Sequence, residues 1–157
     1  MTGPGPHTDA DEVLAQALAD IIELNKADLQ LDDVLYGNHN MIPHASAAIV
    51  MPMGKVRTLA GGSAPGGRTQ NDLRVTISLL WSKVGDETTE RKACDARATA
   101  LEAILHQDTT VGGLIIHGFV NQVERGESPL AGGIGNNGMF RSVIMMYSGV
   151  TKTYLSP

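Results

Sequence analysis

The stretch from Asp86 to Val123 constrains the fold most, because it predicts a helix, a turn and a strand in direct succession. One face of the helix is apolar at the helical period and carries Cys94, Ala98, Leu101 and Leu105. Gly112 and Gly113 free the backbone for a turn. Residues 114–120 are too apolar for alternation, which predicts a strand covered on both faces. A helix packed beside the strand that follows it makes a core, so this stretch predicts a core and not an active site.

Two amphipathic helices are predicted, over about residues 10–26 and 86–107. Asp9 and Glu12 have the spacing of a capping box at the start of the first helix, and Asp86 can cap the second. Pro52 cannot donate a hydrogen bond to a sheet, so it indicates an edge strand or the end of a strand. The predicted strands cover residues 32–36, 45–53 with a continuation at 55–59 after Gly54, 71–82, 114–120 and 139–155.

The strand over residues 71–82 has the clearest pattern in the chain. Its apolar residues alternate with polar ones and are Leu73, Val75, Ile77, Leu79 and Trp81. The order of the elements predicts an α+β fold, in which a mixed or antiparallel sheet is flanked by the two main helices. A length of 157 residues suits a single domain, which we expect over residues 9–157 after a flexible N-terminal arm at residues 1–8.

Charge and composition exclude several classes of protein. The net charge of −5 argues against a protein that binds nucleic acid through a generally basic surface. Cys94 is the single cysteine, so no internal disulfide is possible and a reducing compartment is expected. No apolar run reaches the roughly 18–20 residues that span a bilayer, so no membrane association is predicted.

No motif in the chain predicts an enzyme, a cofactor or a metal site. Residues 133–138 match the pattern GxGxxG, but a strand is predicted after them where a dinucleotide site needs a helix. The glycines at residues 61–67 lack the Gly-Lys-Ser/Thr ending of a phosphate loop. The five histidines include no HExxH pair, and His106 suits the C-terminus of a helix. Cys94 lies on the apolar face, which favours a core residue over a nucleophile.

Arg97 is the one charged residue with an unusual position, because it projects between apolar residues of the second helix. Two interpretations remain open. In the first, its stem covers apolar surface while its head reaches water. In the second, it forms an ion pair that is buried at a subunit interface.

The chain resembles the tail terminator, or tail completion, proteins of long-tailed bacteriophages over roughly residues 10–155. The resemblance rests on Val34-Leu-Tyr-Gly-Asn38, on the strand from Arg74 to Trp81, on the run from Leu101 to Gly118, and on Gly149-Val-Thr-Lys-Thr-Tyr-Leu155. It depends on pattern and order, because the family has no catalytic signature that could be matched.

The resemblance implies a structural protein of the virion, assembled in the host cytoplasm. Such proteins form a hexameric ring at the head-proximal end of the tail tube, stop its polymerisation and offer a surface to neck or connector proteins. Genomic DNA passes through the lumen without sequence-specific binding. Two alternatives stay open: a head–tail connector or neck protein, and a domain that binds or converts a small ligand.

Subunit contacts in such a ring are expected on alanine-rich and methionine-rich faces, which include Ala93, Ala96, Ala100, Met145 and Met146. Two glycine-rich segments, residues 61–70 and 124–138, are predicted as flexible loops that contact the tube end or neighbouring subunits. The candidate contact residues in them are Gly61, Gly62, Arg68, Gln70, Arg125, Glu127, Asn136 and Asn137.

Overall fold

The computed structural model describes residues 9–37, 41–42, 45–59, 68–83, 85–128, 131–132 and 140–154. The elements are α1 (Ala10–Leu24), β1 (Asp33–Tyr36), β2 (Met41–Ile42), β3 (Ser46–Leu59), β4 (Arg68–Ser82), α2 (Glu87–Leu105), β5 (His117–Ser128), β6 (Ala131–Gly132) and β7 (Phe140–Tyr154). The predicted arm at residues 1–8 lies outside the described residues.

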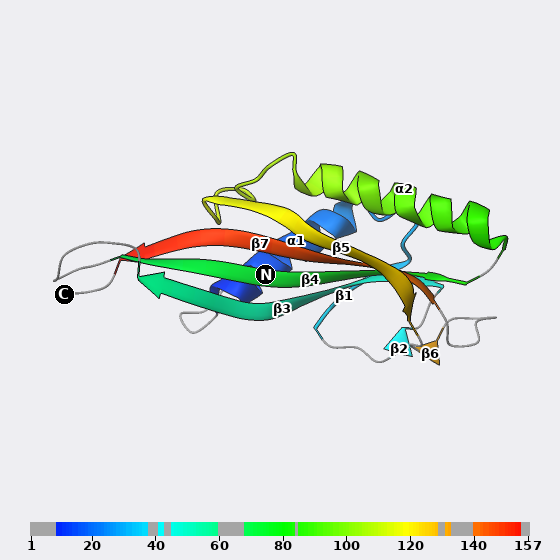
Figure 1. Cartoon of the computed structure of the whole chain (residues 1–157), viewed down its shortest axis with the longest axis horizontal. Helices are drawn as coiled ribbons and strands as arrows, with labels where there is room; N and C mark the ends of the chain where they lie inside the picture. Colours follow the sequence, from blue (N-terminus) through cyan, green and yellow to red (C-terminus); the bar gives the residue numbers. More distant parts are fainter. Residues whose placement is uncertain are drawn as a thin grey trace.

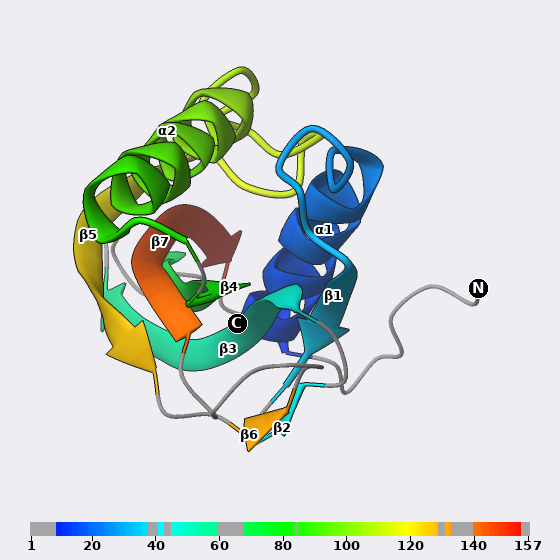
Figure 2. The same ribbon diagram turned by 90° about the vertical axis from the view of Figure 1, so that its right-hand side faces the viewer.

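Five strands form one mixed sheet in the order β1-β3-β4-β7-β5 (Figure 1). Only β1 and β3 run parallel, and the other neighbours are antiparallel. The strands β2 and β6 form a separate two-stranded ribbon. Both helices lie on the same side of the curved sheet (Figure 2). The prediction of a single α+β domain with two main helices is confirmed.

Helix α2 packs on the sheet through the face that its sequence predicts. Its buried residues are Cys94, Ala98, Leu101 and Leu105. The Asp86 carboxylate accepts a hydrogen bond from the Thr89 backbone N–H at 2.9 Å, which lowers the pKa of Asp86 and confirms the predicted cap. At α1 the predicted capping box is wrong, because Asp9 makes no side-chain cap. Its carboxylate lies 3.3 Å from the Lys55 ammonium instead.

Strand β5 differs most from its prediction. Residues 111–116 form a turn in which Val111, Gly112 and Gly113 have positive φ angles, and the strand begins only at His117. The prediction of a strand covered on both faces is wrong, since Leu114, Ile116 and Phe119 are 45%, 48% and 46% exposed. The physical reason is position: β5 is at the edge of the sheet and no described helix covers its second face.

Strands β5 and β7 approach closely where Gly118 and Gly149 are register partners. A methyl group at Gly118 would lie 2.5 Å from the Tyr147 hydroxyl and 2.7 Å from Ile115 Cδ1. A methyl group at Gly149 would lie 2.9 Å from Ile115 Cδ1 and 3.0 Å from Leu14 Cδ2. The two missing side chains therefore make the room that these core residues occupy.

Candidate interaction surfaces

The predicted contact loops are shorter than expected. Arg68 and Gln70 belong to β4, and Arg125 and Glu127 belong to β5, so the prediction of a loop is wrong at these four residues. The polar composition predicts loops, but residues 68–70 and 124–128 pair with β7, and residues 69–70 also pair with β3. Gly61, Gly62, Asn136 and Asn137 lie outside the described residues. Contact with the tube or with neighbouring subunits stays a prediction for all eight.

The side chains of Arg125 and Glu127 make contacts within their own chain. Arg125 Nε lies 2.9 Å from the Asp95 carboxylate of α2, and the Glu127 carboxylate pairs with the Lys83 ammonium. The hydrogen bond from Lys83 lowers the pKa of Glu127. These ion pairs tie β5 to α2 and to the end of β4.

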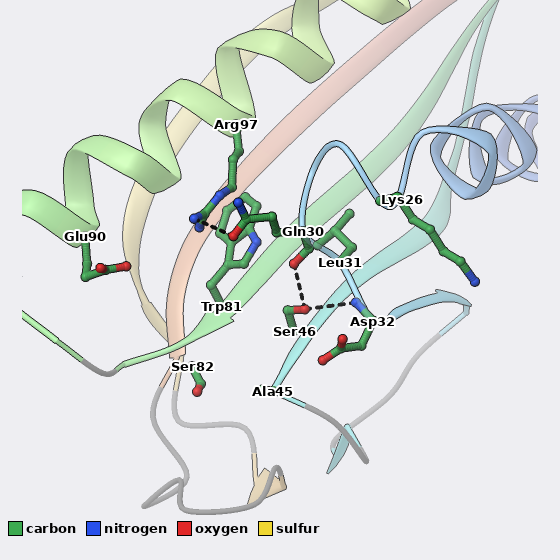
Figure 3. A pocket seen from close by; sticks show the side chains of 11 residues that line it. Lys26, Gln30, Leu31, Asp32, Ala45, Ser46, Trp81, Ser82, Glu90 and Arg97 are labelled. Atoms are coloured by element: carbon green, nitrogen blue, oxygen red, sulfur yellow. Dashed lines mark hydrogen bonds between the residues drawn. The ribbon is translucent and has the colours of Figure 1, made fainter.

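Arg97 rests on the ring of Trp81, as Figure 3 shows. The guanidinium carbon is 5.6 Å from the ring centroid, within the range of a cation–π contact. Its Nη2 donates a hydrogen bond to Gln30 Oε1 at 2.8 Å. The head is thus held by its own chain, which differs from a head that projects freely into water. An ion pair across a subunit interface stays a prediction.

A hollow of about 490 Å³ opens beside Arg97 between α2, the segment after α1 and the end of the sheet (Figure 3). Its lining mixes both charges and is formed by Lys26, Ala27, Gln30, Leu31, Asp32, Ala45, Ser46, Trp81, Ser82, Glu90 and Arg97. The Ser46 hydroxyl donates to the Gln30 carbonyl and accepts from the Asp32 N–H, each at 2.9 Å. Backbone groups of the segment after α1 therefore engage this hydroxyl both as donor and as acceptor.

Replacing Arg97 with alanine should lower the melting temperature without changing the oligomeric state. The change removes a cation–π contact of about 0.5–1 kcal/mol and a hydrogen bond of roughly 1 kcal/mol. Trp81 is the only tryptophan, so its emission should change as well. Lys92→Ala, which removes an exposed cation from the same helix, should alter neither. Loss of oligomers at an unchanged melting temperature would instead support the interface interpretation.

Cys94 and His106, the two side chains with possible chemical roles, both make contacts that stabilise the fold. Cys94 is 1% exposed in the core between α2 and the sheet, so the core interpretation is confirmed, and burial raises the pKa of its thiol. His106 Nε2 accepts a hydrogen bond from the Val120 N–H at 2.9 Å. This bond joins the end of α2 to β5, a role that the sequence pattern did not reveal. Within the described part of the chain, no group of three or more acidic, histidine or cysteine side chains could hold a metal ion.

The sheet face turned away from the helices carries apolar side chains that no described helix covers; we call it the open face. Strand alternation and register place on it Met51, Arg74, Thr76, Ser78, His117, Phe119, Gln122, Glu124, Ile144, Met146, Ser148 and Val150. All of them are half-buried or exposed. Only near one end does a small apolar cluster form on this side, from Ala47, Ile49, Leu80 and Phe140.

Some of the alanine and methionine residues expected at subunit contacts of a ring are accessible on the surface, and others are buried. Met146 lies on the open face, and Ala96 and Ala100 are exposed on α2. Met145 is fully buried against the helices, so its predicted place on a contact face is wrong. Neighbouring residues of a strand point to opposite faces, and β7 divides the two methionines in this way.

Comparison of the chain with models of protein families and with curated proteins finds no match. Among the described helices, none has the length and apolar character needed to cross a membrane.

Proposed function

We propose that this protein is a structural component of a phage virion that caps the head-proximal end of the tail tube as a ring. In this role it stops tube polymerisation and presents a surface to neck or connector proteins. The proposal starts from the resemblance in residue pattern and order of elements. The observation that carries it further is the open face of the sheet.

The open face supports assembly because its apolar residues are accessible in a single subunit. Phe119 of β5 is 46% exposed, and Ile144 and Met146 lie in the neighbouring strand β7 with only partial cover. Met51, in β3 on the far side of β4, is also half-buried. Contiguous exposed apolar residues with a polar rim are typical of protein contacts. A contact between two different faces of identical subunits forms a ring when its rotation closes, and a filament when it does not.

The charge of the chain supports passage of DNA through such a ring. The net charge is −5, with 17 carboxylates against 12 lysine and arginine side chains. An acidic lumen repels the phosphate backbone, so DNA can slide without being held.

The test combines mass measurement with electron microscopy of the purified chain. The wild-type protein should form closed rings, alone or on tail tubes. Phe119→Glu should shift the population to monomers, because a buried aromatic contact is worth about 2 kcal/mol or more and the new carboxylate would be desolvated. Only monomers at every concentration, together with monomers on isolated tails, would contradict the proposal.

A matched control separates assembly from general surface effects. Leu24 is 86% exposed at the end of α1, away from the open face, so Leu24→Glu should leave rings intact. In a phage that lacks its terminator, the wild-type chain should restore tails of uniform length. Rescue of head joining without an effect on tail length would favour the connector alternative.

A further inference from the structure

The second half of β3 is an edge of the sheet. Strand β1 pairs only with Ala47–Val50, so the stretch from Met51 to Leu59 has β4 on one side and no described strand on the other. The Gly37 N–H donates to the Val50 carbonyl at 2.9 Å, so the backbone groups of Val50 face β1. By alternation the backbone of Pro52 faces the same side. Proline has no N–H, and no described strand on that side needs one for a hydrogen bond.

Two backbone positions beyond Pro52 face this edge. A register shift lies between Pro52 and Lys55, and the Gly54 N–H donates to the Asp11 carboxylate at 3.0 Å. After the shift, Val56 pairs with Asp72, whose backbone groups face β3 by alternation along β4. The N–H and C=O groups of Lys55 and Arg57 therefore point away from the sheet, toward the edge.

The edge strand itself carries two cations, although the chain is acidic. The Lys55 ammonium lies 3.3 Å from the Asp9 carboxylate, and Arg57 Nε donates a hydrogen bond to Asn71 Oδ1 at 3.0 Å. Residues 51–59 contain Lys55 and Arg57 and no carboxylate, whereas the whole chain has a charge of −5. Both residues are exposed, with 29% exposure of the Lys55 side chain beside Asp9, and Arg74 across the register shift is exposed as well. Met53 and Val56 add apolar surface, with 48% and 45% exposure.

The two cations disfavour pairing of this edge with the same edge of a second copy, and they favour a partner of opposite charge. Two copies paired through this edge about a two-fold axis centred on Val56 would place Lys55 opposite Arg57, and like charges directly opposite destabilise a sheet. The other long edge, on β5, is less open, because the Val120 N–H is already bound to His106. Backbone groups that meet no described neighbouring strand, together with apolar residues, fit an extended peptide better than a nucleic acid.

We propose that the β3 edge at residues 55–58 binds an extended acidic segment of a partner protein, which adds to the sheet as a further strand. Backbone hydrogen bonds to Lys55 and Arg57 hold the segment. Acidic side chains on it give Arg57, whose hydrogen bond is to the neutral Asn71, a charged partner, and they compete with the exposed Asp9 for Lys55. Apolar side chains on the other face of the segment contact Val56. The inference goes beyond the proposed ring, because it assigns a second surface to a partner of different sequence.

The experiment uses the full chain labelled for NMR and three probes. The first is an eight-residue peptide that alternates glutamate with valine. The second is the same peptide with N-methyl groups on alternate residues, which blocks one hydrogen-bonding edge and keeps the charge. The third is a mixed-sequence DNA duplex. The first peptide should bind saturably and shift the amide signals of Lys55 and Arg57, and the N-methylated peptide should bind about tenfold more weakly, as expected for one or two lost hydrogen bonds.

Variants test the charge requirement. Lys55→Glu/Arg57→Glu should weaken the first peptide at least about tenfold, whereas Lys26→Glu/Lys92→Glu, with the same net charge, should not. Equal binding of the two peptides, no binding, or tighter binding of the duplex at the same residues would overturn the proposal. The N-methylated probe keeps the test valid if the first variant fails to fold. Ring formation is measured separately by mass, so failure here leaves the proposed function intact.

Discussion

Replacement of Gly118 with alanine should destabilise the folded chain by about 1–3 kcal/mol or more, the usual cost of overpacking a core. The new methyl group would lie 2.5 Å from the Tyr147 hydroxyl and 2.7 Å from both Tyr147 Cε1 and Ile115 Cδ1. Tyr147 is fully buried, so its ring cannot move aside into solvent. Urea titration followed by circular dichroism would measure the loss. Gly126→Ala in the same strand is the matched control, because its nearest atom is Ser142 Oγ at 3.7 Å.

The clash can be assigned to one atom by a double-mutant cycle with Tyr147→Phe. The Tyr147 hydroxyl has no hydrogen-bond partner among the described residues, and burial raises the pKa of Tyr147 to about 12. Removing the hydroxyl should therefore be neutral or stabilising by about 1 kcal/mol. In the double mutant it should also recover part of the loss at Gly118, because the closest contact is gone. Additive effects of the two changes would contradict this packing explanation.

Arg141→Ala should also have a large effect, about 2–5 kcal/mol. Arg141 lies at the start of β7 with only 2% of its side chain exposed, and its Nη2 is 3.1 Å from the Glu87 carboxylate. Alanine would leave space where the largest of the fully buried side chains stood and would remove the bond to the first turn of α2. A thermal melt together with a urea titration would measure the cost.

Arg125→Ala is the control that isolates burial. Arg125 lies on the same sheet face and also pairs with a carboxylate of α2, at 2.9 Å, but 55% of its side chain is exposed. Solvent screening limits such a pair to about 1 kcal/mol or less. If both substitutions cost the same, the importance assigned to the buried position of Arg141 is wrong.

Local pattern was sufficient to predict the helices and the central strands. The buried residues of α2 are the four that its period selects, and Leu73 to Trp81 alternate as β4 requires. Pro52 indicates an edge, and the structure confirms it, because a residue without an N–H is tolerated only where no neighbouring strand needs that donor.

Tertiary position decided what the pattern could not. Apolar residues at 114–120 suggested a strand with two covered faces, but cover depends on neighbours that are distant in the sequence. In the sheet β4 pairs with β7, which follows it by some sixty residues in the sequence. No local sequence pattern indicates that β5 is the edge strand. Arg97 meets Trp81 and Gln30 only because three separate segments converge, so its contacts could not be read from the spacing within α2.

The place of β7 in the sheet has a consequence for the making of the protein. This strand follows all the others in the sequence, yet it lies between β4 and β5. A nascent chain therefore keeps the facing edges of β4 and β5 unpaired until residues 140–154 have been synthesised. Unpaired edges are templates for association with other chains. A chain that stops early cannot form the centre of the sheet, so truncated products should be cleared or aggregate before they can take a place in any assembly.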